Sequence, residues 1–192
     1  SEIRLGKYLK KSDDVFLVTK GGVDWHDNRR VNMSNDPKVM AKMLHESLKR
    51  LDRDCIDLYM IHWPDPKVDI RSPLEILYKA REQGKIRYVG LANTNEEDLH
   101  KAREIISVVG FQAEHNLWTT KNYELVESHL ESDLFMGWGT FDKGILSGRV
   151  SVERKYDSSD ARSWAPWWNK KEVKSKLDRI ETLKTLLSAN GM

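Results

Sequence analysis

Short apolar runs separated by amphipathic segments recur along this chain, and this alternation constrains the fold more than any other feature of the sequence. Each run is almost continuously apolar or β-branched, which is typical of parallel strands buried on both faces. The runs cover residues 15–19, 56–61, 88–92, 111–113 and 134–138. A strand followed by a helix, repeated five times, predicts an α/β fold with one parallel sheet and right-handed crossovers.

Helix-start and helix-stop signals mark the segments between these runs. Asp36 followed by Pro37 is an N-cap with proline at the first helical position. Ser72–Glu75 has the form of a capping box, and Gly84 is placed to end the helix that follows. We expect further helices to begin at Ser1–Ile3 and Thr94–Glu97 and to cover residues 121–132 and 172–189.

Residues 150–170 form a long irregular segment that contains Trp164, Trp167 and Trp168. Disordered segments are poor in aromatic residues, so we expect these tryptophans to pack over an apolar surface. No composition shift or Pro/Ser-rich linker marks a boundary, and the sequence therefore predicts a single domain over residues 1–192.

The charges of the chain nearly balance, with 32 Lys and Arg against 30 Asp and Glu. This balance argues against nucleic acid or a membrane surface as a partner, since both need a cluster of positive charge. No secretory signal or membrane-length apolar stretch is recognised, and Cys55 is the single cysteine. We therefore expect a cytoplasmic protein without disulfides or a metal site, with Cys55 as a buried small hydrophobe. The sequence does not indicate an oligomeric state.

Polar side chains stand at the ends of four successive runs. Lys20 stands at the end of the first run, His62 and Asn93 follow the next two, and Gln112 interrupts the fourth run, with Glu114 and Asn116 after it. The carboxyl ends of the strands meet at the active site of a (β/α)8 barrel, so such side chains would converge on an apolar floor. Neither G-x-G-x-x-G nor G-x-x-x-x-G-K-[ST] is present, but barrels bind phosphates with other loops.

Several motifs closely resemble the aldo-keto reductase superfamily, in the expected order and spacing over nearly the whole chain. They are Thr19–Gly21, Ser47–Leu51, Asp54–Tyr59, Ile61–Pro66, Gly84–Asn93 and Trp138–Gly148. The resemblance implies a (β/α)8 barrel of the TIM-barrel type, of which about five parallel strands are present. It also implies binding of NADPH and reduction of small aldehydes or ketones.

Residue roles follow from the same resemblance. Lys20 matches the lysine that lowers the pKa of a proton-donating tyrosine, and His62 matches the histidine that polarises the carbonyl group. The remaining matches are to cofactor-binding residues: Asn93 and Gln112 for the nicotinamide carboxamide, Trp138 for stacking on the ring, and Gly139, Phe141 and Gly144 for the loop that carries the pyrophosphate.

Departures from the family pattern leave alternatives open. The family's aspartate and proton-donating tyrosine precede a Ser-Glu pair, and Ser1-Glu2 is where this sequence starts. We therefore expect a fragment, truncated at both ends, that is inactive alone although its parent is a reductase. Tyr8 and Tyr59 do not match the missing tyrosine. The alternatives are an incomplete sequence of a full enzyme and a non-catalytic NADPH-binding or regulatory protein, for which Ala92 (in place of a serine) and Trp138 would be signs of relaxed catalytic demand.

Each proposed site residue also has an ordinary structural explanation. Lys20 could be a solvated surface lysine, and His62 a core histidine. Asn93 and Gln112 could be loop caps, and Trp138 a core residue. The ordinary explanation is preferred for the other histidines, which show no metal-ligand spacing, and for Asp57 and Glu114, which are expected to form ion pairs in the sheet wall. The other histidines are His26, His45, His100, His115 and His129.

Overall fold

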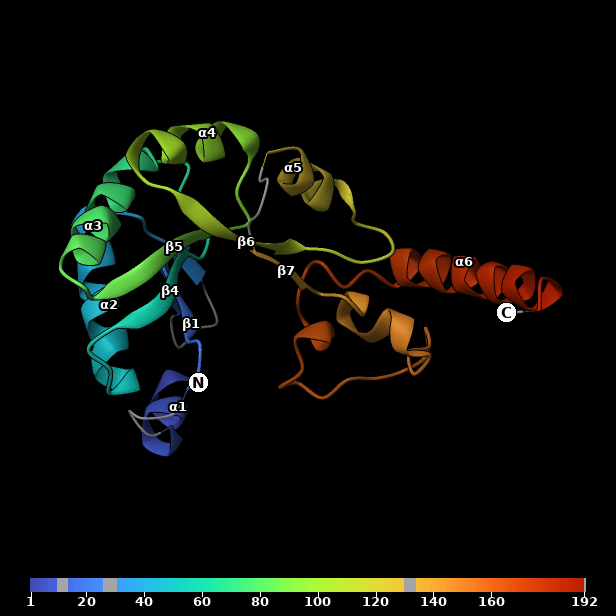
Figure 1. The fold of residues 1–192 in the computed structure, drawn as a ribbon. Coiled ribbons are helices and arrows are strands. Elements are labelled where there is room, and N and C mark those ends of the chain that lie inside the picture. Colours follow the sequence, from blue (N-terminus) through green and yellow to red (C-terminus); the bar gives the residue numbers. More distant parts are fainter. Residues whose placement is uncertain (10–13, 26–30, 130–133, 192) are drawn as a thin grey trace. The chain divides into compact units, whose positions relative to one another are not determined.

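The computed structural model describes residues 1–9, 14–25, 31–129 and 134–191 (Figure 1). Their contacts divide the chain into two compact units, Ser1–Trp138 and Gly139–Met192. We call them the first and second units and describe each by itself. Whether the whole chain acts as one domain stays a prediction.

A sheet of five parallel strands forms the centre of the first unit, in the order β1-β4-β5-β6-β7. The strands are β1 (Val18–Gly21), β4 (Ile56–Ile61), β5 (Ile86–Ala92), β6 (Val108–Glu114) and β7 (Leu134–Trp138). This sheet confirms the predicted α/β class. The first strand begins three residues later than its apolar run and continues through Gly21, so Lys20 lies inside the strand rather than after it.

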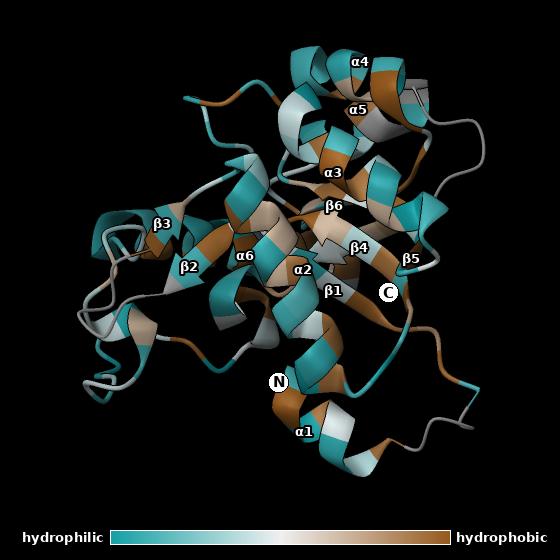
Figure 2. Cartoon of the chain, turned by 90° about the vertical axis from the view of Figure 1, so that its left-hand side faces the viewer, coloured by the Kyte–Doolittle hydropathy of each residue, from teal (hydrophilic) through white to brown (hydrophobic). Residues whose placement is uncertain are grey.

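Helices α1 (Glu2–Tyr8), α2 (Pro37–Leu51), α3 (Arg71–Glu82), α4 (Glu96–Ile105) and α5 (Lys121–His129) complete the first unit with a short hairpin. Figure 1 shows α2, α3 and α4 following one another along one side of the sheet. In Figure 2 these helices carry teal and brown bands, as expected of amphipathic helices that bury one face. The hairpin of β2 (Val23–Trp25) and β3 (Val31–Met33) was not expected, because three-residue strands show no periodicity.

Two of the predicted helix starts, at Asp36 and Asn95, are confirmed by side-chain caps. The Asp36 carboxylate accepts hydrogen bonds from the amides of Lys38 and Val39, at 2.9 and 3.2 Å. Asn95 likewise accepts a hydrogen bond from the amide of Asp98 at 2.8 Å. These bonds satisfy amides that no helical carbonyl can reach.

The prediction of a capping box that begins at Ser72 was wrong. Helix α3 begins at Arg71, and the Asp69 carboxylate accepts the Arg71 amide at 2.9 Å and pairs with the Arg71 guanidinium at 2.7 Å. Asp69 therefore organises the chain before Ser72 is reached. At the other end of the helix, Gly84 has φ of 72°, which is the left-handed conformation expected of a residue that ends a helix.

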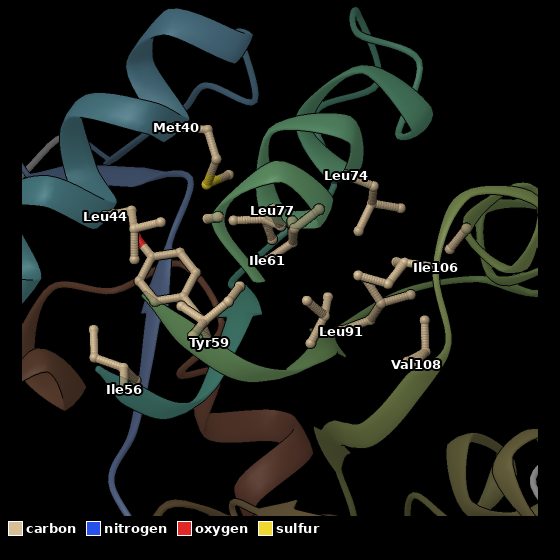
Figure 3. Close-up of a cluster of buried hydrophobic side chains, with 14 of the residues drawn as sticks. Met40, Leu44, Ile56, Tyr59, Ile61, Leu74, Leu77, Leu91, Ile106 and Val108 are labelled. Atoms are coloured by element: carbon tan, nitrogen blue, oxygen red, sulfur yellow. The ribbon is translucent and has the colours of Figure 1, made fainter. Parts of the chain in front are cut away.

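The main core lies between the sheet and helices α2–α4. Figure 3 shows Met40 and Leu44 of α2 and Leu74 and Leu77 of α3 facing side chains of the strands. The strand residues in this view are Ile56, Tyr59, Ile61, Leu91 and Val108. All of these side chains are buried. Full burial of one such side chain contributes about 1.5–3 kcal/mol, so this layer is the principal source of stability in the unit.

Two glycines let side chains lie close against the other face of the sheet. A Cβ atom at Gly90 would lie 2.7 Å from the Gly110 carbonyl oxygen and 2.8 Å from Cε of Met60. A Cβ atom at Gly110 would lie 2.9 Å from Cδ2 of Leu58. Leu58 and Met60 are fully buried because they occupy the space that these glycines leave.

The second unit contains two 3-10 helices, η1 (Asp142–Ser147) and η2 (Ala161–Ser163), and helix α6 (Lys170–Ala189). Ile145, Val150 and Val173 form its small core, and Trp168 packs against them. Trp164 and Trp167 are each 46% exposed, so the expectation of an apolar surface beneath the tryptophans holds for Trp168 alone. Among the described helices of both units, none combines the length and apolar character needed to cross a bilayer.

Candidate functional site

The carboxyl edge of the sheet brings together five of the residues singled out from the sequence. Lys20 is the third residue of β1, His62 follows β4, and Asn93 follows β5. Gln112 lies near the end of β6, opposite Ala92 on one side and Met136 on the other, and Trp138 ends β7. Parallel pairing places all five at the same edge, because the strands run in one direction.

Lys20 and His62 border one cavity of about 450 Å³, which is also lined by Thr19, Arg50 and Glu2. His62 is half-buried, and its burial together with the positive charge of Lys20 lowers its pKa. Burial also lowers the pKa of Lys20. His62 is therefore neutral at physiological pH and can donate one ring N–H to an oxygen atom in the cavity.

A partly buried acid, Glu2, closes one side of this cavity. The Glu2 carboxylate accepts hydrogen bonds from the Thr19 hydroxyl and from Nε of Arg50, both at 2.6 Å. Burial alone would raise the pKa of Glu2, but these two bonds and the charge of Arg50 outweigh it and lower the pKa. The network joins α1, α2 and β1 beside Lys20. Sequence reasoning missed it, because it depends on contacts between residues far apart in the chain.

A hydrogen-bonded chain links the ends of four strands, β4, β5, β6 and β7. The indole Nε1 of Trp138 donates to Oδ1 of Asn93 at 2.9 Å, and Nδ2 of Asn93 donates to the His62 carbonyl oxygen at 3.0 Å. The Asn93 amide nitrogen donates to the Gln112 carbonyl oxygen at 2.8 Å. Asn93 has φ of 55°, a left-handed conformation that asparagine tolerates better than most residues. Trp63, which the sequence did not single out for a role, has its ring 6.5 Å from that of Trp138.

Gly139, Phe141 and Gly144 belong to the second unit and are described within it. Gly139 and Gly144 have φ of 65° and 99°, and Phe141 is exposed. The carbonyl oxygens of Gly139 and Phe141 accept hydrogen bonds from the amides of Asp142 and Gly144, at 2.7 and 2.9 Å. These residues form two consecutive tight turns, and their proposed role in binding a cofactor stays a prediction.

The remaining expectations have mixed outcomes. Tyr8 is exposed at the end of α1, and Tyr59 is buried in the core, where burial raises its pKa. Asp57 forms the expected ion pair, with Arg87 at 2.8 Å. Cys55 is only partly buried, so the expectation of a buried cysteine was wrong. Residues His26 and 130–133 lie outside the described residues.

Comparison with known proteins decides the family. A model of the Aldo/keto reductase family matches residues 1–192. The chain belongs to the aldo/keto reductase family. It is 31% identical over 191 residues to the aldo-keto reductase YhdN of Bacillus subtilis, covering 97% of this chain and 57% of that protein. It is 25% identical to the aldo-keto reductase yakc [NADP(+)] of Schizosaccharomyces pombe, covering 98% of this chain and 58% of that protein.

The fold agrees with this assignment. The glycerol dehydrogenase AKR11B4 from Gluconobacter oxydans superposes with a TM-score of 0.82 and 27% identity, covering 99% of this chain and 60% of that protein. This aldo/keto reductase chain thus spans less than two thirds of the length of these relatives. Its five-stranded parallel sheet corresponds to part of a (β/α)8 barrel, and the predicted incomplete barrel is confirmed. Members of the family are oxidoreductases.

Proposed function

We propose that this chain carries part of the active site of an NADPH-dependent reductase of aldehydes and ketones. One observation supports this proposal above the others: a histidine, a lysine, two amides and an indole meet at one edge of the sheet. The proposed substrate is a small carbonyl compound, and a cytoplasmic location and the absence of nucleic-acid or membrane partners remain predictions from the sequence.

The residues at this edge fit a planar ring that bears an amide. Asn93 keeps one N–H of Nδ2 and one lone pair of Oδ1 after its two hydrogen bonds, and Gln112 and Trp138 are both partly exposed. An indole face stacks well on a flat heteroaromatic ring. The name of the S. pombe relative includes NADP(+), which favours a nicotinamide cofactor here. When bound, a reduced nicotinamide would supply hydride to the carbonyl carbon.

His62 and Lys20 would act at the oxygen atom of the carbonyl group. The neutral His62 would donate its ring N–H to the carbonyl oxygen and stabilise the negative charge that develops there. The Lys20 cation would favour the anionic form of a proton donor placed beside it. No tyrosine is among the residues that line the cavity around Lys20 and His62 in the described part of the chain. We therefore expect little carbonyl reduction by this chain alone.

That same observation favours a second candidate function, a non-catalytic NADPH-binding protein of this family. Binding needs Asn93, Gln112 and Trp138, whereas turnover also needs a proton donor in the cavity. The two candidate functions therefore differ in whether a carbonyl substrate is reduced, and not in the affinity for NADPH.

The test is a titration of the purified chain with NADPH, followed by quenching of tryptophan emission and energy transfer to the nicotinamide. Saturable binding that Asn93→Gly weakens, with the matched surface change Asn190→Gly as control, would support the site. Addition of an aldehyde to the bound chain then separates the candidates: steady NADPH oxidation supports a reductase, and none supports the binding protein. A folded chain that binds no NADPH would contradict both.

A further inference from the structure

The hydrogen bonds of Asn93 determine which way its side-chain amide faces. An indole Nε1 can only donate, so the atom of Asn93 that lies 2.9 Å from Trp138 must be the oxygen Oδ1. A carbonyl oxygen can only accept, so the atom that lies 3.0 Å from the His62 oxygen must be the nitrogen Nδ2. Because both partners are chemically unambiguous, the reversed amide would face a donor with a donor and an acceptor with an acceptor.

The backbone of Asn93 is held as firmly as its side chain. Its amide nitrogen donates to the Gln112 carbonyl oxygen at 2.8 Å, across the β5–β6 pair. Trp138 is held in turn by its own carbonyl oxygen, which accepts the His115 amide at 3.0 Å. The indole reaches Asn93 from β7, although β6 lies between β7 and β5 in the sheet. Among these contacts, the hydrogen bond from the Trp138 indole N–H is the one that the side-chain oxygen of Asn93 accepts.

We propose that Trp138 is a positioning residue, whose indole N–H holds the Asn93 amide in one orientation so that its remaining N–H faces the ligand. This role rests on the function proposed above. Asn93 then recognises an acceptor, which is the carbonyl oxygen of the nicotinamide carboxamide. A phenylalanine at position 138 would keep a ring for stacking but would remove one of the two bonds that orient the Asn93 amide, so that reversal would be opposed by the His62 carbonyl alone.

The first test examines the bond without any ligand. In the proton–nitrogen spectrum of the labelled chain, Trp138→Phe identifies the Trp138 indole signal by its loss. We expect that proton to exchange with solvent about two- to tenfold more slowly than the indole proton of the half-exposed Trp167, the range expected for one net hydrogen bond. Asn93→Gly, which tolerates φ of 55°, should remove this difference. Equal exchange in the unmodified chain would overturn the proposal.

The second test separates orientation from mere packing. NADPH offers both an acceptor and a donor in its carboxamide, whereas its 3-acetylpyridine analogue offers only the acceptor. A reversed Asn93 amide can still pair with NADPH but not with the analogue. We expect Trp138→Phe to weaken binding of the analogue by about two- to tenfold more than binding of NADPH. The control Trp164→Phe, in the second unit, should leave the ratio of the two dissociation constants unchanged.

The outcomes distinguish this role from the proposed function. Equal weakening of both ligands would show that Trp138 acts through packing alone, which overturns the positioning role. Unchanged binding of both ligands in Trp138→Phe would overturn it as well while leaving NADPH binding intact. A folded, unmodified chain that binds neither ligand would refute the proposed function and the positioning role together.

Discussion

Helices α2 and α6 both carry apolar residues at helical spacing, but the two units bury them to very different extents. Helix α2 has 15 residues and buries Met40, Leu44, Ser47, Leu48 and Leu51. Helix α6 has 20 residues, and Val173 is its only buried residue. A five-stranded sheet lies under the helices of the first unit, whereas the second unit has a short loop core against which α6 packs. An apolar stripe therefore predicts a helix, but the element beneath it decides how much of the stripe is buried.

The two units also differ in where they hold charge. In the second unit a fully buried carboxylate, Asp142, accepts Lys176 at 2.7 Å and lies 3.3 Å from Lys143. In the first unit the buried layer between helices and sheet is apolar, and charged side chains stand at the strand ends. We therefore expect the first unit to depend on packing and the second on an ion pair.

The largest effect should come from the core of the first unit. Leu77→Ala removes a fully buried side chain and should lower the free energy of unfolding by about 2–5 kcal/mol, through lost burial and the cavity left behind. Leu186→Ala in α6, at 57% exposure, should change it by no more than about 0.5 kcal/mol. Urea unfolding of both variants is the measurement. Similar losses of unfolding free energy in the two variants would contradict the proposed difference between the units.

The next effect, confined to the second unit, should follow from removal of the ion pair between Lys176 and the buried Asp142. Lys176→Met takes the nearest cation from the buried Asp142 and should cost about 3 kcal/mol, measured as loss of α6 helicity in urea. Burial alone would lower the pKa of Lys176, but its bonds to Asp142 and Glu172 raise it above the usual 10.5. The stabilisation is therefore complete below pH 10.5 and is lost as the pH rises through the raised pKa.

Lys176→Met should accordingly be less sensitive than the unmodified chain to a rise in pH above 10.5. Lys184→Met, which removes an exposed pair with Glu181, serves as the control and should cost no more than about 1 kcal/mol. Equal effects of the two lysine changes would mean that burial of Asp142 does not strengthen the ion pair.

The smallest effect concerns the charge at the strand ends and leaves the fold intact. Burial and the charge of Lys20 both lower the pKa of His62, so Lys20→Met should raise that pKa toward its usual value without fully restoring it. Titration of the His62 ring protons by NMR measures the change, with Lys67→Met as a control on the exposed loop after His62. No difference between the two variants would show that Lys20 and His62 do not share one electrostatic environment.

Local patterns were sufficient for most of the fold, and they failed where a neighbouring side chain competed with them. The five strands and the helices followed from apolar runs, caps at Asp36 and Asn95, and Gly84. Helix α3 begins before the predicted Ser72 because the Asp69 carboxylate accepts the Arg71 amide first. Lys20 lies inside β1 because its pairing with β4 continues to Gly21, beyond the apolar run.

The sequence by itself determined the α/β class and the edge at which Lys20, His62 and Asn93 would meet. Strand periodicity and the common direction of parallel strands are local properties, and both can be read from residue order. Only the tertiary structure decided that Glu2 joins Thr19 to Arg50 and that Trp138 bonds Asn93. These contacts join residues 17 to 48 positions apart, and their geometry depends on strand order and register, which no local pattern encodes.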